Sequence, residues 1–200
     1  GQKTGWFYDH RMNRQRLQAY APGKKVLDVF SYVGGWGIQA ACAGASQVTC
    51  VDASSAAVDA VHHNAKLNGL ENVDTIEGDA FDALKALADE KEKFDIVVLD
   101  PPALIPRRRD QKAGEQAYAR LNQLGLRLLE RDGLLVSASC SMHLSQEKLI
   151  DIIRSSGRKI DRFVQLLEQG HQAPDHPIVP GIPETDYIKS CFVRSLTGFL

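Results

Sequence analysis

KVLDVFSYVGGWG, residues 25–37, is the stretch of sequence that decides the fold. Its first six residues are mostly apolar, which is typical of a short buried strand. Gly34, Gly35 and Gly37 follow, and glycines allow the backbone to turn tightly and to pass close to a ligand. An alanine-rich run over residues 35–43 then predicts a helix. The stretch therefore predicts a strand, a glycine-rich turn and a helix that begins beside a ligand.

Strand-like and helix-like segments alternate along the rest of the chain. Such alternation predicts βαβ units, and hence a largely parallel sheet with helices on both faces. Because ligands of such sheets bind at the carboxyl ends of the strands, the residues that follow each strand are the candidates for function. Further strands are expected at residues 47–52, 73–77, 94–99, 133–139, 159–168 and 187–196, and further helices at residues 9–20, 55–68, 79–87, 113–129 and 145–155.

Aspartates accompany the first three predicted strands: Asp28 in the first, Asp52 at the end of the second and Asp79 after the third. A carboxylate after the second strand suits the two hydroxyls of a ribose. One after the third could accept a hydrogen bond from an adenine amino group. Each aspartate could instead simply cap the helix that follows it. Since all three occur beside a glycine-rich turn, we favour a ligand site and expect the carboxylates to lie side by side at one edge of the sheet.

A dinucleotide site is the first alternative for this turn. It requires the pattern G-x-G-x-x-G, whereas the chain has G-G-W-G, with Ala40 three residues after Gly37. A pyrophosphate favours a helix N-terminus without negative charge nearby, and Asp28 would repel it. S-adenosylmethionine (SAM) carries an ammonium and a sulfonium, so acidic groups near the turn favour this cationic ligand.

The fourth predicted strand ends in Asp100-Pro101-Pro102. Proline cannot continue a strand ladder, and its fixed φ makes a stiff turn. Such a turn could present Asp100 and its neighbouring carbonyls to a planar base. A turn that merely ends the strand is the alternative interpretation.

The fifth predicted strand leads into Ser139-Cys140-Ser141, on the same edge as Asp100. Carbon 5 of a pyrimidine is a poor nucleophile, but a thiolate that adds to carbon 6 makes carbon 5 enamine-like and able to attack a methyl sulfonium. Cysteine suits this task because it is intrinsically nucleophilic and partly ionised near neutral pH. A buried structural cysteine explains the spacing equally well. His143, close by, is a candidate acid or base.

The composition is that of an ordinary globular domain, with 44% hydrophobic and 24% charged residues. A net charge of −1 argues against a grip on nucleic acid by the whole surface. Basic runs within the first 25 residues and at residues 107–109 either solubilise the chain or hold phosphates, and charge alone favours the first interpretation. The sequence has no apolar run of the length that a membrane helix needs, and it shows no signal peptide.

The remaining cysteines, Cys42, Cys50 and Cys191, fall within a predicted helix or strands, and all three are expected in the core. No pair has C-x-x-C spacing, and the six histidines form no convincing ligand set, so we expect no metal. Free thiols favour a cytoplasmic protein.

Nine motifs in order along the chain resemble a known family. The chain is similar to the catalytic domain of the bacterial large-subunit rRNA (cytosine-C5) methyltransferases that carry an N-terminal PUA domain. The motifs GQKTGWFYDHR, SCS and QAPDHP are specific to this family, whereas LDPP is not. The motifs are GQKTGWFYDHR (1–11), VLDVFSYVGGWG (26–37), DAS (52–54), NAKLNG (64–69), GDAF (78–81), LDPP (99–102), SCS (139–141), QAPDHP (172–177) and PETDYIK (183–189).

The resemblance implies a class I SAM-dependent methyltransferase fold, an α/β, Rossmann-like, seven-stranded and mostly parallel sheet with the last strand antiparallel. It also implies Cys140 as the nucleophile and Asp100 at the base. Other cytosine-C5 enzymes place a second cysteine where this chain has Ala103, so the base that removes the carbon 5 proton is unassigned. SAM contacts are implied for Lys3, Thr4, Asp9, Asp28, Phe30, Ser31, Tyr32, Gly34, Gly35, Asp52, Ala53, Asp79, Ala80 and Asp100.

Family members carry a PUA domain and a linking segment before this point. We therefore interpret residues 1–200 as an excised catalytic domain, with residues 1–22 as an opening segment and helix packed on it. The expected function is methyl transfer from SAM to carbon 5 of a cytosine in rRNA, flipped out to reach Cys140. A guanine-modifying sister branch, an N-methyltransferase of a small molecule and a non-catalytic SAM-binding module are the alternatives. No membrane partner is expected, and a homodimer is left open.

Overall fold

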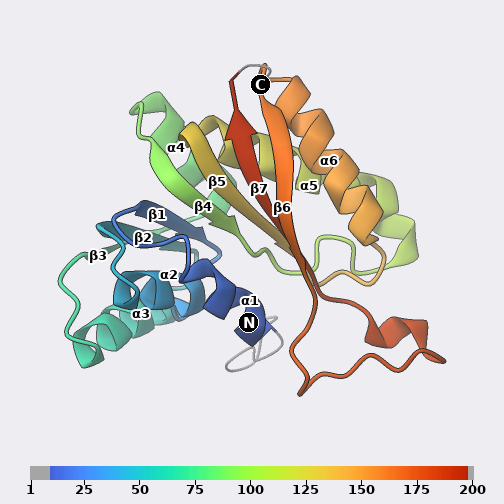
Figure 1. Ribbon diagram of the computed structural model, residues 1–200, viewed down its shortest axis with the longest axis horizontal. Helices are drawn as coiled ribbons and strands as arrows, with labels where there is room; N and C mark the ends of the chain where they lie inside the picture. Colours follow the sequence, from blue (N-terminus) through green and yellow to red (C-terminus); the bar gives the residue numbers. More distant parts are fainter. Residues whose placement is uncertain (1–9, 198–200) are drawn as a thin grey trace.

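Seven strands form one sheet in the computed structural model, which describes residues 10–197. The strand order is β3-β2-β1-β4-β5-β7-β6 (Figure 1). The first five strands pair in parallel, whereas β7 runs antiparallel to both β5 and β6. The expected Rossmann-like sheet with an antiparallel last strand is therefore confirmed. The strands are β1 (Lys25–Val29), β2 (Gln47–Asp52), β3 (Val73–Glu77), β4 (Phe94–Leu99), β5 (Leu129–Ser139), β6 (Phe163–Gly170) and β7 (Lys189–Leu196).

Helices cover both faces of the sheet (Figure 1). The first three pack on one face and the next three on the other, so that each crossover places a helix beside the strands that it joins. The short 3-10 helices η2 and η3 lie in loops. The helices are α1 (Arg11–Leu17), α2 (Gly35–Cys42), α3 (Ser55–Leu67), α4 (Ala80–Asp89), α5 (Gln111–Arg127) and α6 (Gln146–Arg158), with η2 (Arg108–Asp110) and η3 (Pro183–Thr185).

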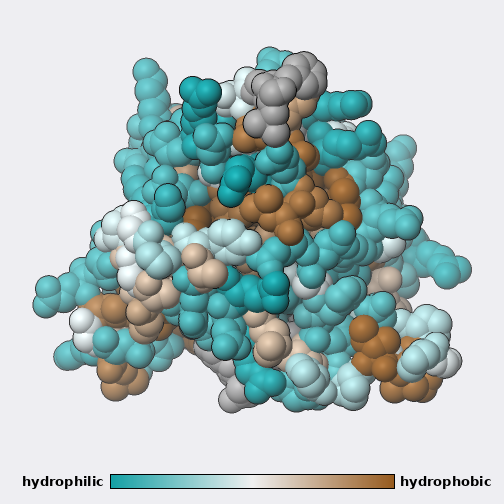
Figure 2. All heavy atoms as spheres, viewed as in Figure 1, coloured by the Kyte–Doolittle hydropathy of each residue, from teal (hydrophilic) through white to brown (hydrophobic). Residues whose placement is uncertain are grey.

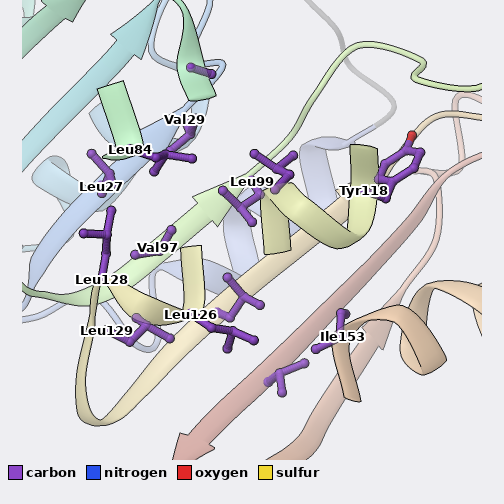
Figure 3. Close-up of a cluster of buried hydrophobic side chains, with 14 of the residues drawn as sticks. Leu27, Val29, Leu84, Val97, Leu99, Tyr118, Leu126, Leu128, Leu129 and Ile153 are labelled. Carbon is purple, nitrogen blue, oxygen red and sulfur yellow. The ribbon is translucent and has the colours of Figure 1, made fainter. Parts of the chain in front are cut away.

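Alternate residues of the central strands supply two apolar cores, because successive side chains of a strand point to opposite faces. In β4, Val97 and Leu99 face α4, α5 and α6, whereas Ile96 and Val98 face α1, α2 and α3. Figure 3 shows the first core, in which Tyr118 of α5 lies at the margin with its hydroxyl turned away from the apolar side chains. The near-continuous apolar run of β4 is thus explained by burial on both faces.

The boundary between α6 and β6 differs from the sequence-based expectation. A strand was expected from residue 159, but α6 continues to Arg158 and β6 begins at Phe163. The amides of Ile160 and Arg162 both donate to the carbonyl of Gly157, which closes a tight turn after the helix. A Cβ on Gly157 would lie 3.0 Å from the Arg162 carbonyl, so glycine permits this turn.

The three cysteines other than Cys140 differ in burial. Cys50 and Cys191 are buried as expected, but Cys42 is exposed on α2, so its expected place in the core is wrong.

Apolar side chains gather over β6 and in the loop between β6 and β7 (Figure 2), where Phe163 and Ile182 are among the exposed large hydrophobics. None of the helices within residues 10–197 is both long enough and apolar enough to cross a membrane.

Candidate active site at the carboxyl ends of the strands

The loop between β1 and α2 has an unusual backbone. Phe30 and Tyr32 have φ angles of 61° and 50°, in the left-handed region that non-glycine residues rarely adopt. Gly34, which precedes α2, has a φ of 90°. The loop is fixed by the amide of Ser31, which donates to the Val51 carbonyl at 2.9 Å. Strain of this kind persists where the surrounding structure enforces it, and it is common at ligand sites.

Asp28 lies beneath this loop and holds the start of α2. Its Oδ2 accepts a hydrogen bond from the amide of Gly37 at 2.9 Å, and the residue is fully buried. A Cβ on Gly37 would lie 2.7 Å from the Cys50 sulfur and 3.2 Å from this same Oδ2. The glycine is therefore required for the close approach of α2 to β1 and β2.

Asp52 and Asp79 lie nearer to solvent than Asp28. Asp52 accepts hydrogen bonds at 2.9 Å from the amides of Tyr32 and Ser54, which ties the end of β2 to the β1–α2 loop. Asp79 is exposed and caps α4 through the amide of Asp82. Asp28 pairs in register with Cys50, two residues before Asp52, so it lies deeper in the sheet. The three carboxylates are thus not in one row as expected, although Asp52 and Asp79 follow neighbouring strands at the same edge.

Asp100 is buried directly after β4, where helices α1 and α2 approach it. Trp36 Nε1 donates to its Oδ2 at 3.0 Å, and His10 Nε2 lies 3.6 Å from its Oδ1. The rings of His10 and Trp36 are themselves 5.6 Å apart. The Asp100 carboxylate therefore links His10, at the N-terminus of α1, to the edge of the sheet, a role that the sequence did not indicate.

Cys140 follows β5, and its sulfur lies 3.9 Å from the carbonyl oxygen of Pro101. The turn is held from below by Tyr118, whose hydroxyl lies 2.9 Å from the hydroxyls of both Ser139 and Ser141. Burial raises the pKa of Tyr118, so the hydroxyl keeps its proton for these bonds at neutral pH. The cysteine is half-buried and lines a surface hollow.

Two hollows flank the turn that follows Cys140. The first, of about 380 Å³, is lined by Cys140 and His143 together with Tyr187 and Glu184 of the β6–β7 loop. The second, of about 430 Å³, is lined by residues of the same loop and by Lys189. The S-C-S turn therefore contacts the D-P-P turn through Pro101, and Ala103, which follows the D-P-P turn, lines the first hollow together with Cys140.

Lys189 is a candidate that sequence reasoning missed. It is the first residue of β7, it is 5% exposed, and its ammonium donates a hydrogen bond to the Ser141 carbonyl. Burial lowers its pKa to about 8, although Asp186 and Cys140 partly oppose this change. The signal available in the sequence was its place at the end of the PETDYIK motif, just ahead of the apolar run 191–193.

Among the remaining predicted positions, Gly35 and Ala80 are buried as the first residues of α2 and α4. Lys3, Thr4 and Asp9 lie outside the described residues. Ala53 is exposed beside Asp52, so it borders the same edge. Within residues 10–197, no three histidine, cysteine or acidic side chains come together in a way that could hold a metal ion.

Comparisons with known proteins agree with this architecture. The chain is 39% identical over 197 residues to ribosomal RNA large subunit methyltransferase I of Aeromonas salmonicida, and 36% identical over 196 residues to the protein of the same name in Erwinia tasmaniensis. These alignments cover 98% and 97% of this chain but 50% of each relative. The chain thus spans about half the length of the curated relatives that it matches.

Solved structures share the fold. The crystal structure of SMU.776 complexed with SAH has a TM-score of 0.84 at 24% identity, over 96% of this chain and 50% of that one. The SAM-dependent methyltransferase from Agrobacterium tumefaciens has a TM-score of 0.71 at 22% identity, over 97% and 64% of the two chains. The fold is therefore that of the class I SAM-dependent methyltransferases. A family model described as conserved hypothetical protein 95 matches residues 14–154, which is more than half of the chain, and the chain therefore belongs to that family.

Proposed function

We propose that this chain is the catalytic part of a SAM-dependent methyltransferase that forms 5-methylcytosine in large-subunit rRNA. The observation that carries the proposal is the meeting of Cys140 with the Pro101 carbonyl beside an open hollow, at the edge of a methyltransferase fold. The names of the relatives support an rRNA substrate, because both are large-subunit rRNA methyltransferases.

The polar groups at the edge fit SAM. Asp52 is partly exposed and Asp79 is exposed, so both carboxylates can accept hydrogen bonds from ribose hydroxyls or an adenine amino group. The strained loop of Phe30, Ser31 and Tyr32 would hold the amino-acid end, with Asp28 contributing negative charge from below. When bound, SAM supplies an electrophilic methyl group. The chain's own task is to hold that group in line with the target atom and to keep water away.

Cys140 would make the cytosine reactive. Its thiolate forms a bond to carbon 6, and the electron pair of the C5–C6 double bond moves to carbon 5, which can then accept the methyl group. Loss of the carbon 5 proton returns an electron pair, reforms the double bond and expels the thiolate. The group that takes this proton lies among those that line the hollow, and His143 is the candidate that the sequence singled out.

RNA would approach over the exposed arginines 107–109, which follow the Pro106 wall of the hollow. Arg107 is paired with Asp110 at 3.0 Å, but both side chains are accessible, and such a surface pair exchanges readily for a phosphate. Asp100 is held by Trp36, so it would act on the base mainly by fixing the turn that carries the Pro101 carbonyl.

Mass spectrometry of nucleosides tests the proposal. Unmodified large-subunit rRNA is incubated with labelled SAM and either the wild-type chain, Cys140→Ala or Cys42→Ala, the last being an exposed cysteine far from the hollow. Because this chain spans about half the length of its relatives, the same set is also run in a chimaera in which this chain replaces the matching half of the Aeromonas salmonicida relative. The proposal predicts labelled 5-methylcytidine with the wild type and with Cys42→Ala but none with Cys140→Ala. Label in a different nucleoside, or full turnover by Cys140→Ala, would refute it.

A further inference from the structure

Lys189 and Cys140 are brought together by the pairing of β5 with β7. Lys189 lies opposite Ser139 in the antiparallel register, and its ammonium reaches the carbonyl of Ser141. The backbone of Lys189 thus pairs with Ser139, the residue before Cys140, and its ammonium is hydrogen-bonded to Ser141, the residue after Cys140. Lys189 therefore links the two residues that flank Cys140.

Burial makes the charge of Lys189 significant. Lys189 is 5% exposed as a residue, and a buried lysine keeps its charge only where nearby groups favour the charged form. The Ser141 carbonyl accepts one of its protons, and Asp186 and the Cys140 sulfur act on it electrostatically. A positive charge in this weakly screened position acts strongly on a thiol beside it.

The placement of the two hollows separates a positioning role from a catalytic one. Cys140 lines the first hollow, where the base would lie, whereas Lys189 lines the second, on the other side of the turn at Ser141 and Met142. The ammonium therefore acts on the thiol from the side of the turn that faces the second hollow. It is badly placed to remove a proton from a base in the first hollow.

We propose that Lys189 is a positioning residue, which fixes the Cys140 turn through the Ser141 carbonyl and stabilises the thiolate by its positive charge. This inference rests on the proposed function, which needs that thiolate. When Cys140 ionises, its proton passes to water and the ammonium balances the new negative charge. The other titratable groups near the thiol are Tyr118 on α5, Asp100 after β4, His143 after β5, and Glu184, Asp186 and Tyr187 in the β6–β7 loop.

The rate of alkylation by iodoacetamide, followed at Cys140 by peptide mass spectrometry across pH, tests this directly. The chain carries Cys42→Ala to remove the exposed thiol. Lys189→Gln keeps a hydrogen-bond donor but loses the charge, Lys189→Arg keeps the charge, and Lys66→Met on the exposed side of α3 is the matched control. We expect the pH at which the alkylation rate of Cys140 is half-maximal, its midpoint, to rise by about one unit in Lys189→Gln, with about tenfold slower alkylation at neutral pH. Lys189→Arg and Lys66→Met should keep the wild-type midpoint.

An unchanged midpoint in Lys189→Gln overturns the proposal, and so does an equal shift in Lys189→Gln and Lys189→Arg, because charge would then be irrelevant. A second measurement serves if Lys189→Gln does not fold. The amine of Lys189 is titrated by NMR in the wild type and in Cys140→Ala, and loss of the thiolate must lower its midpoint, since coupling between two sites is reciprocal. An equal midpoint in both proteins refutes the proposal. Neither readout requires RNA or methyl transfer, so failure of the proposed function is recognised separately.

Discussion

Gly37→Ala tests the close packing of α2 against β1 and β2, beside the loop between β1 and α2. The new Cβ would lie 2.7 Å from the Cys50 sulfur and 3.0 Å from Cγ1 of Val48, and both side chains are fully buried. Overpacking of a core costs about 1–3 kcal/mol, and the upper half of that range applies where neighbours cannot move aside. The better helix propensity of alanine returns about 1 kcal/mol. We therefore expect a net loss of about 1–2 kcal/mol, or a Tm lower by about 2–8 °C.

Urea unfolding and thermal melts of four proteins measure this effect. They are the wild type, Gly37→Ala, Cys50→Ala and the double variant, in which the closest of the three contacts is removed. The cost of Gly37→Ala must be smaller in the Cys50→Ala background, because residues in contact are not additive. Equal costs in the two backgrounds, or a Gly37→Ala protein as stable as the wild type, would refute the packing argument.

Three further substitutions test hydrogen bonds elsewhere in the molecule. Tyr118→Phe removes the hydroxyl that bridges two serines beside the cysteine, so we expect a loss of about 1–2 kcal/mol in urea unfolding and a lower rate of methyl transfer, with SAH affinity unchanged; an unchanged rate would contradict this. Asp52→Asn should weaken SAH binding about tenfold by calorimetry without loss of fold, and full affinity would remove Asp52 from the site. Burial raises the pKa of Glu168, but hydrogen bonds from Tyr20 and Arg16 outweigh it and leave the pKa below its ordinary value. Glu168→Gln should therefore cost about 1 kcal/mol at pH 7. Because the pKa is lowered in the folded protein, the difference from the wild type should shrink as pH falls below the ordinary pKa of glutamate and through the lowered one; a constant difference would exclude this linkage.

Most of the fold could be predicted from patterns of residues that lie close together in the sequence. The strands at residues 47–52, 73–77 and 94–99 have the bounds that apolar runs between turn residues predict. The helices α3, α4 and α6 also begin within one residue of the expected positions, because Ser54, Asp79 and Ser145 cap them through amides only three positions away. The start of β6 was missed because the turn at Gly157 depends on carbonyl and amide groups whose pairing a sequence does not display.

The candidate site needed contacts between distant segments, and these were harder to predict. Cys140 could be placed because it follows a strand, and the D-P-P turn because it follows the neighbouring one. The bond from Lys189 to the Ser141 carbonyl spans 48 positions in the chain, and the bond from Trp36 to Asp100 spans 64. Cys42 was expected in the core because it lies in an apolar helix, but it falls on the outward face.

Covalent trapping tests the central claim, the attack of Cys140 on a cytosine, most directly. Large-subunit rRNA fragments that contain 5-fluorocytidine are incubated with the protein and SAM, because fluorine at carbon 5 cannot leave as a proton does and the adduct persists. The wild type should give an RNA–protein band that survives denaturation, with the RNA attached to the peptide that contains Cys140. Cys140→Ala should give none. An adduct that maps to another residue, or methylated product from ordinary rRNA with no adduct from the fluorinated one, would contradict the account.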